Sequence, residues 1–173
     1  YYKNGKLLYE GEFLNSKLNG KGKEYYSNGN LFFEGEYSYG KIWNGKGYTI
    51  NGKFDFEIKE GKCFIKQYYD NGAILFEGEL DEGEINGKGK EYYANGKLKY
   101  EGEYLNNKRW TGNIYNINGK IDYEIKGGKG YVGETNDNRI LLFEGQYING
   151  KPNGKGKEYY NNGNLLIEGE YLN

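Results

Sequence analysis

A short triplet, Glu-Gly-Glu, returns along the whole chain and limits the folds that this sequence can adopt. It begins at Glu10, Glu34, Glu77, Glu101 and Glu168, each time beside an aromatic or aliphatic residue, and Glu144-Gly145-Gln146 is a near copy. Successive copies are 24, 43, 24, 43 and 24 residues apart, and each gap of 43 divides into 23 and 20 at a degenerate copy that begins at Glu57 or Glu124. The resulting super-period of 67 residues is typical of one supersecondary unit stacked on copies of itself.

These boundaries predict a single repeat array over residues 1–173, with a partial unit at each end. The units are 1–9, 10–33, 34–56, 57–76, 77–100, 101–123, 124–143, 144–167 and 168–173. Because both ends fall inside a unit, we expect the chain to be a fragment of a longer one, and the lack of a targeting segment then says little about the parent. Function should be sought on an extended surface rather than in one pocket.

Composition favours strands over helices. Tyr and Phe account for 21 and 8 residues and Met is absent, whereas helices are usually built from Ala, Leu and Met. Thirty glycines with a single proline indicate many tight turns in a regular ladder. The sequence therefore predicts an all-β fold, an elongated antiparallel β-meander of successive β-hairpins in one open sheet, with no helix. About 15 strands spaced by ~4.8 Å would extend for roughly 70 Å.

The first full unit, residues 10–33, predicts the register of one hairpin. Asn28-Gly29 lies between two strand-like segments and indicates a two-residue turn, since both residues tolerate positive φ. The expected partners are Tyr26 with Leu31, Tyr25 with Phe32, Glu24 with Phe33, Lys23 with Glu34, Gly22 with Gly35 and Lys21 with Glu36. Because side chains alternate between faces, one face carries aromatic residues and glycine and the other carries Lys–Glu pairs.

Other units repeat this register. The same counting places Lys90 opposite Glu101 and Lys157 opposite Glu168. The last 20-residue unit departs from it, because Asn138-Arg139 replaces the usual Asn-Gly turn.

Paired glycines leave a trough on the aromatic face, where a ring from a neighbouring strand can lie flat. Burial of one ring removes about 150–250 Å² from water, and this offsets the entropic cost of glycine in a strand. The predicted trough glycines are Gly11, Gly22, Gly35, Gly78, Gly89, Gly102, Gly145, Gly156 and Gly169. Glu24, Glu91 and Glu158 fall on the same face by parity, which indicates either a partly wet face or a bulge nearby.

The charges and missing residue types exclude several functions. Lys and Arg total 24 against 25 Asp and Glu, with alternating signs, so there is no basic face for a nucleic acid. The chain has no histidine, the usual general base and commonest metal ligand. Carboxylate pairs such as Glu10 and Glu12 recur opposite lysines, which favours a charged ladder over an acid/base pair. We predict no catalytic residue, no metal site and no cofactor, and a buried structural thiol for Cys63, opposite Leu80.

Several segments resemble the MORN repeat, the membrane occupation and recognition nexus motif. The resemblance lies in Tyr9-Glu10-Gly11-Glu12-Phe13, Lys17 to Gly22 and Tyr25 to Gly29, and Asn-Gly-Lys-Gly returns at Asn44, Asn86 and Asn153. The match is closest to the MORN_2-like variant of the YwqK family, whose members are described as antitoxins. The resemblance implies an elongated sheet of hairpins used for scaffolding, self-association or lipid contact. This chain departs from the commonest pattern by placing Phe13, Tyr37 or Tyr104 where Trp is frequent.

Residues that do not repeat uniformly are the candidates for partner contact. Trp43 and Trp110 occur only in the 23-residue units, at the same place in the connecting segment. They either close the end of the hydrophobic face as corner residues or offer aromatic anchors to a partner. In the second case the row of candidate partner-contact residues is Leu18, Trp43, Ile85, Trp110 and Pro152.

The leading hypothesis is a non-catalytic repeat scaffold that binds a protein partner or another copy of itself. An alternative is an exported surface module that binds choline or a glycan, because the tyrosine-rich rhythm is distantly similar to choline-binding and toxin repeats. Lipid binding and antitoxin activity follow from the family resemblance alone, and balanced charge argues against electrostatic lipid contact. The sequence leaves the compartment open, with a cytoplasmic location slightly favoured over an exported or cell-surface one.

Overall fold

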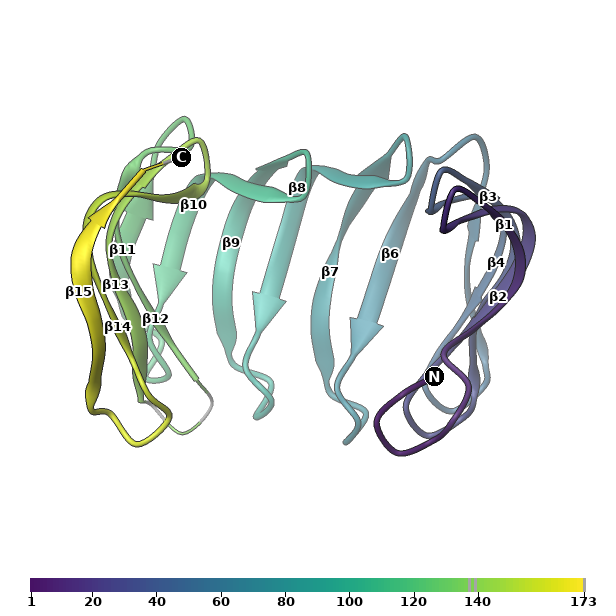
Figure 1. Cartoon of the computed structure of the whole chain (residues 1–173), viewed down its shortest axis with the longest axis horizontal. Coiled ribbons are helices and arrows are strands. Elements are labelled where there is room, and N and C mark those ends of the chain that lie inside the picture. Colours follow the sequence, from purple (N-terminus) through teal and green to yellow (C-terminus); the bar gives the residue numbers. More distant parts are fainter. Residues whose placement is uncertain (137, 139, 173) are drawn as a thin grey trace. The chain divides into compact units, whose positions relative to one another are not determined.

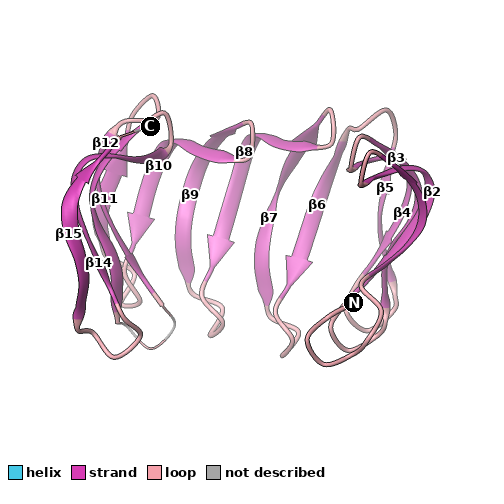
Figure 2. Ribbon diagram, in the orientation of Figure 1, coloured by secondary structure: helices cyan, strands magenta, loops and turns pink. Residues whose placement is uncertain are grey.

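Fifteen strands and their turns form the computed structural model, which describes residues 1–136, 138 and 140–172 (Figure 1). The strands are β1 (Tyr9–Leu14), β2 (Lys17–Tyr25), β3 (Leu31–Ser38), β4 (Lys41–Tyr48), β5 (Phe54–Ile58), β6 (Cys63–Tyr68), β7 (Ile74–Asp81), β8 (Glu84–Tyr92), β9 (Leu98–Leu105), β10 (Lys108–Tyr115), β11 (Ile121–Ile125), β12 (Gly130–Thr135), β13 (Leu141–Ile148), β14 (Lys151–Tyr159) and β15 (Leu165–Tyr171). Figure 2 shows strands and loops and no helix in this part of the chain. The predicted all-β array of successive hairpins is confirmed.

The chain divides into two compact units, residues 1–87 and 88–173. Within the residues that the structure describes, no helix has the length and hydrophobicity needed to cross a membrane. The predicted turn at Asn138-Arg139 includes Arg139, which lies outside the described residues.

The strands form three antiparallel sheets, whereas the sequence predicts a single open one. The sheets contain β1–β5, β6–β11 and β12–β15, and within each sheet the strands are ordered as in the chain. The breaks fall at the β5–β6 and β11–β12 connections, where only one isolated bridge forms, Lys59 with Lys62 or Lys126 with Lys129.

The turns at the two breaks form backbone hydrogen bonds to the hairpins beside them. The Gly61 N–H donates to the Trp43 carbonyl (2.9 Å), and the Gly61 carbonyl accepts from the Gly83 N–H (2.9 Å). Gly128 makes the equivalent bonds one super-period later, to Trp110 and Gly150. Each short turn is therefore tied to the ends of the hairpins beside it, and its own two strands do not continue a ladder.

The turn at Asn28-Gly29 differs from the predicted two-residue turn. The Gly29 N–H donates to the Tyr26 carbonyl and the Tyr26 N–H donates to the Asn30 carbonyl, both at 2.8 Å. Only Gly29 has positive φ, at 90°. This is a three-residue loop, a type I turn followed by a left-handed glycine.

A bulge close to this loop restores the predicted register. Tyr25 pairs with Leu31 rather than with Phe32, and the ladder then shifts so that Glu24 pairs with Phe33. From that point the predicted partners are confirmed, including Gly22 with Gly35 and both Lys–Glu pairs. The same shift recurs at Tyr48, Tyr68, Tyr115 and Tyr159.

Two-residue turns with positive φ at both residues lie at the opposite ends of the hairpins. They are Asn15-Ser16, Tyr39-Gly40, Glu60-Gly61, Glu82-Gly83, Asn106-Asn107, Gly127-Gly128 and Asn149-Gly150. The φ of the first residue is 49–55° in each of these turns. Such turns match the right-handed twist of the strands that they join.

Aromatic rings lie over glycines on the aromatic face, which is the inner, core-forming face of the sheets. Phe33 is fully buried, and its Cζ atom lies 2.9 Å and 2.7 Å from the positions that a Cβ would take at Gly35 and Gly45. The Tyr37 ring covers Gly22 in the same way, at 3.2 Å. A side chain at these glycines would displace a core ring, which fits the prediction that paired glycines leave a trough for aromatic rings.

The remaining predicted trough glycines fall in three groups. Rings of Tyr100, Phe143 and Tyr171 contact Gly102, Gly145 and Gly156. Gly78 and Gly89 are buried. Gly11 lies against the backbone of Lys21 and Gly22, and no atom of another residue lies within 4 Å of a Cβ built at Gly169.

Candidate interaction surface

The outer face of β1–β5 carries a row of alternating charge. Successive cross-strand partners in this row are Glu10, Lys23, Glu34, Lys46 and Glu57. Tyrosine hydroxyls donate to its carboxylates, from Tyr25 to Glu10 (2.5 Å) and from Tyr48 to Glu34 (2.6 Å). In the second unit Tyr159 donates to Glu144 (2.7 Å) in the same way. Carboxylates held by lysine and tyrosine neighbours fit a structural ladder.

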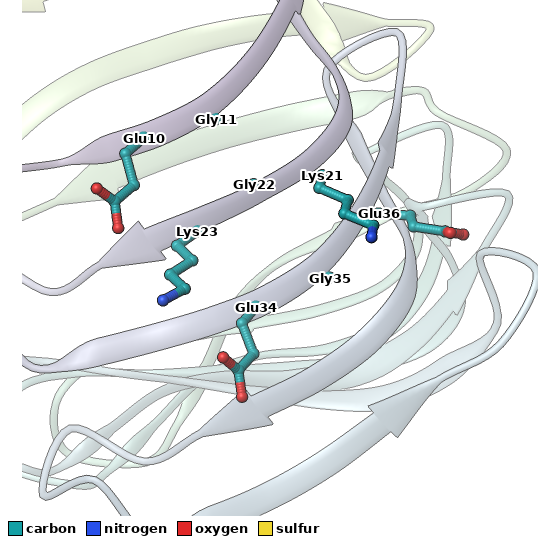
Figure 3. Close-up of a pocket in the computed structure, with 8 residues that line it drawn as sticks. All are labelled: Glu10, Gly11, Lys21, Gly22, Lys23, Glu34, Gly35 and Glu36. Carbon is teal, nitrogen blue, oxygen red and sulfur yellow. The ribbon is translucent and has the colours of Figure 1, made fainter.

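A groove of about 590 Å³ lies on this face of β1–β3 (Figure 3). Its lining residues are Glu10, Gly11, Lys21, Gly22, Lys23, Glu34, Gly35 and Glu36. Figure 3 shows Glu10, Lys23 and Glu34 on one side of the three glycines and Lys21 with Glu36 on the other. The groove therefore runs across the strands, with backbone as its floor and charged side chains as its walls.

An equivalent groove of about 460 Å³ lies on β12–β15 in the second unit. It is lined by Tyr131, Lys155, Gly156, Lys157, Glu168, Gly169 and Glu170. Six of these positions follow those of the first groove by 134 residues, which is two super-periods. Tyr131 is the difference, because the first groove has no aromatic residue among its lining residues.

The Asn-Gly-Lys-Gly motif has separate structural reasons for its two glycines. The first glycine has positive φ, 102° at Gly20, 104° at Gly87 and 92° at Gly154. A Cβ at Gly154 would meet the Gln146 side chain, whose Oε1 accepts a hydrogen bond from the Lys155 N–H (3.1 Å). The second glycine, at position 22 or 156, lies under an aromatic ring.

Trp43 and Trp110 are the extra residues of two β-bulges. In the first unit Tyr37 pairs with Ile42 and Glu36 pairs with Asn44, so that Trp43 has no cross-strand partner. Trp110 has the same place between Arg109 and Thr111. A bulge turns one side chain away from the regular alternation of the strand. Both indoles are half-buried.

The other candidate partner-contact residues differ in exposure. Leu18 is only 7% exposed and belongs to the core, so it offers little surface to a partner. Ile85 and Pro152 are half-buried. The carbonyls of Leu18, Trp43 and Trp110 accept hydrogen bonds from Gly40, Gly61 and Gly128, respectively. A Cβ at Gly128 would lie 2.5 Å from the Trp110 ring, which shows that this indole packs on the next turn.

A nearly buried ion cluster in the second unit was not found from the sequence. Arg109, whose side chain is 14% exposed, donates from Nε and Nη2 to the two carboxylate oxygens of Glu91 (2.7 Å and 2.5 Å) and from Nη1 to Glu134 (3.2 Å). Its guanidinium lies over the Tyr100 ring, 5.1 Å from the centroid. The Tyr104 hydroxyl donates to Glu91 (2.6 Å). Two-point hydrogen bonding and ring stacking are both specific to arginine.

The first unit has the same glutamate without the arginine. The residues 67 positions before Glu91, Arg109 and Glu134 are Glu24, Ile42 and Gln67. A comparison of the two super-periods could have revealed the joint change of Ile42 to Arg109 and Gln67 to Glu134. The sequence reasoning sought uniform repetition and passed over it.

This difference sets opposite pKa shifts at the two glutamates. Burial raises the pKa of Glu24 to about 6, against hydrogen bonds from Tyr9 and Tyr37 that act to lower it. The contribution of Tyr37 is weak, because its buried hydroxyl forms no hydrogen bond of good geometry within the described residues. Burial also acts to raise the pKa of Glu91, but the hydrogen bonds and charge of Arg109 outweigh it and lower the pKa. The aromatic face thus accommodates these glutamates as half-buried hydrogen-bond acceptors.

Cys63 pairs with Leu80, as the sequence predicts. The thiol is half-buried, and burial raises its pKa to about 11. A thiol with a raised pKa forms little thiolate at neutral pH, which fits a structural role. Within the described part of the chain, no group of three or more Cys, Asp or Glu side chains could hold a metal ion.

These features define a repeat protein of stacked β-hairpins with an aromatic core face and a charged, grooved outer face. Comparison with protein families matches the MORN repeat to residues 9–31 and 143–165, and the MORN repeat variant to residues 1–15 and 85–106. The chain is a MORN repeat protein, as its sequence predicts. Comparison with curated proteins gives no match. MORN repeats are generally non-enzymatic and generally take part in protein or membrane binding.

Proposed function

We propose that this chain is a non-catalytic interaction module that binds a protein partner through bulged tryptophans at the ends of its strands, with self-association as the second form of the same activity. The supporting observation is that Trp43 and Trp110 occupy equivalent bulges and are half-buried rather than fully buried in the core. Tryptophan is enriched among the residues that contribute most to protein interfaces.

The backbone hydrogen bonds at each tryptophan support the proposal. Backbone hydrogen bonds from Gly61 and Gly128 hold the two tryptophan carbonyls in place. Anchors on a fixed backbone lose little conformational entropy when a partner binds. Ile85 and Pro152 are half-buried apolar residues that directly precede Asn86 and Asn153, as Trp43 precedes Asn44. The proposed contact residues are therefore Trp43 and Ile85 in residues 1–87, where Leu18 lies in the core, and Trp110 and Pro152 in residues 88–173.

The test measures complex formation by the purified chain and by a Trp43→Ala, Trp110→Ala variant. Sedimentation velocity over a wide concentration range detects self-association, and photo-crosslinking in a native extract followed by isolation of the stoichiometric complex detects a protein partner. We expect the double variant to lose either complex. Phe54→Ala is the matched control, because Phe54 is 59% exposed on β5 but lies outside the tryptophan bulges. Equal loss in the control and the double variant would contradict the proposal.

Membrane binding is the other activity that is general among these repeats. The formal net charge is −1 and the outer face of β1–β5 alternates in sign, so no electrostatic attraction to anionic lipids is expected. Flotation with anionic liposomes at physiological salt tests this directly. Antitoxin activity and export to the cell surface stay predictions of the sequence.

A further inference from the structure

The groove on β12–β15 differs from its counterpart on β1–β3 by an exposed aromatic wall. Tyr131, on β12, is 53% exposed and lies on the face where most positions carry charge. Its cross-strand partner is Gln146. The Gln146 side chain is engaged by the Lys155 backbone (3.1 Å) and therefore leaves the Tyr131 ring open to the groove.

A second ring fixes the position of this wall. Tyr123 contacts Tyr131 in a tilted arrangement, with 6.4 Å between ring centroids and 44° between ring planes. The Tyr123 hydroxyl oxygen in turn lies 2.6 Å from the position that a Cβ would take at Gly133. Tyr131 is thus an aromatic surface on a rigid strand with a packed neighbour, and it is prepared to bind a flat apolar group at small entropic cost.

The opposite side of the groove offers two lysines as hydrogen-bond donors and two glutamates as acceptors. Lys155 and Lys157 on β14 stand opposite Glu170 and Glu168 on β15. Lys157 and Glu168 form an ion pair at 3.5 Å, in which the two side chains are 40% and 60% exposed. The two lysines and two glutamates give this side of the groove no net charge, so it favours neither anions nor cations.

We propose that this groove binds a neutral oligosaccharide, with one pyranose ring stacked on Tyr131 and its hydroxyl groups bonded to the Lys155–Glu170 and Lys157–Glu168 pairs. A pyranose has an apolar face of C–H groups, which suits an aromatic ring, and a rim of hydroxyls that both donate and accept. Ammonium groups can only donate and carboxylates can only accept, so alternating pairs match hydroxyls in either role. The volume of about 460 Å³ lies in the range of small-molecule sites.

The groove on β1–β3 provides an internal comparison. It shares the positions of the two lysines, two glutamates and two glycines on the paired strands, adds Glu10 and Gly11, and has no aromatic lining residue. Stacking is therefore absent there, and only the β12–β15 groove should bind the sugar tightly enough to measure. This inference is independent of the proposed protein contact at the tryptophans, because it uses another face and other residues.

The experiment titrates the full chain with cellohexaose, chitohexaose and maltohexaose by calorimetry and by NMR. We expect saturable binding to at least one of these probes, and binding weaker by about two- to tenfold for Tyr131→Ala, the loss expected for one aromatic contact. Tyr131→Phe should bind as the parent chain does. Tyr160→Ala is the matched control, because Tyr160 is also 53% exposed but does not line the groove, and it should bind normally.

Three outcomes would overturn the inference. These are no binding to any of the three probes, equal binding by Tyr131→Ala and the parent chain, and tighter binding of an anionic probe such as oligogalacturonate than of the neutral sugars. A folded Tyr131→Ala variant is verified by unchanged amide chemical shifts outside β12 and β13. If that variant fails to fold, Lys155→Met and Glu170→Gln take its place, and each should weaken binding of the same probe while unchanged binding would again count against the site.

Discussion

At the scale of single residues, the 67-residue super-period provides a comparison within one molecule. Glu24 and Glu91 occupy equivalent positions on the aromatic face, yet only Glu91 has an arginine beside it. A nearly buried guanidinium with paired carboxylates costs much desolvation, which its hydrogen bonds must offset. Removing one partner from such a cluster therefore has a larger effect than the ion pair itself contributes.

Arg109→Ile, which introduces the residue found at position 42, should lower the free energy of unfolding of the second unit by about 3 kcal/mol, because Glu91 is left buried without its cation. The additional change Glu134→Gln, which introduces the residue found at position 67, should recover part of this loss by removing one of the two unpaired carboxylates. Urea unfolding of both variants measures the effect. A single variant as stable as the parent, or a double variant less stable than the single one, would contradict this account.

Glu24 should make the stability of the first unit depend on pH. Its folded pKa of about 6 is above the ordinary glutamate value of about 4.5, so the folded state binds its proton more tightly. Its stabilising contribution is full below the unfolded pKa and is lost as the pH rises through about 6. The difference is at most about 2 kcal/mol, and partial exposure reduces it. Carbon-detected NMR titration of the Glu24 carboxyl measures the pKa, and urea unfolding of Glu24→Gln between pH 4.5 and pH 7.5 should lack this part of the pH dependence. A carboxyl that titrates near 4.5 would show the account to be wrong.

At the scale of the hairpin, the recurring glycines differ in what a side chain would meet. Gly102 and Gly169 are equivalent, being 67 residues apart. A Cβ at Gly102 would lie 2.6 Å from the Tyr100 hydroxyl and 2.7 Å from the Gly112 Cα, whereas nothing lies within 4 Å at Gly169. Substitution at Gly102 is therefore limited by Tyr100 on its own strand and by the backbone of β10 beside it.

Gly102→Ala should destabilise the second unit by about 1–3 kcal/mol, the usual cost of forcing extra atoms into a packed core. Gly169→Ala should be neutral or slightly stabilising, because it reduces the entropy of the unfolded chain without a clash. Thermal unfolding monitored by circular dichroism compares the two variants directly. Similar melting temperatures for both variants would mean that the packing of Tyr100 and β10 does not require glycine at position 102.

At the scale of the whole molecule, the chain consists of two compact units, each with one tryptophan. In stacked repeats each element contacts its near neighbours, so a local change need not spread through the whole array. Trp43 and Trp110 are then separate reporters of residues 1–87 and 88–173.

Single-tryptophan variants, Trp43→Phe and Trp110→Phe, allow each unit to be followed by fluorescence. Adding Arg109→Ile should lower the urea midpoint reported by Trp110 more than the midpoint reported by Trp43, since the cluster lies entirely in the second unit. Equal shifts of both midpoints would show instead that the chain unfolds as one cooperative body.

The sequence was sufficient for much of the fold because its information is local and repeated. Asn-Gly turns, alternating side chains and paired glycines are each determined by neighbours along the chain or directly across a hairpin. Two errors cancelled in the register of the first hairpin. The loop at Asn28-Gly29 has one residue more than predicted, and the Phe32 bulge restores the pairing from Glu24–Phe33 onward.

The candidate surface was less accessible to sequence reasoning. Trp43 and Trp110 were identified by their irregular spacing, but their place in bulges depends on backbone hydrogen bonds between hairpins. The Arg109 cluster joins β8, β10 and β12, and its members are 18 and 25 residues apart. No periodic pattern within a single repeat unit contains this cluster, because its members come from three repeat units.

The sequence by itself determined the all-β hairpin array, the family, the two faces and the pairing of lysines with glutamates, because these follow from short-range periodicity and charge. The tertiary structure decided where the sheets break, which glycines lie under rings, that Leu18 is buried and that Arg109 neutralises a buried glutamate. Those properties depend on which side chains from different hairpins come within a few ångströms of each other, and identical motifs in separate units can differ in that respect.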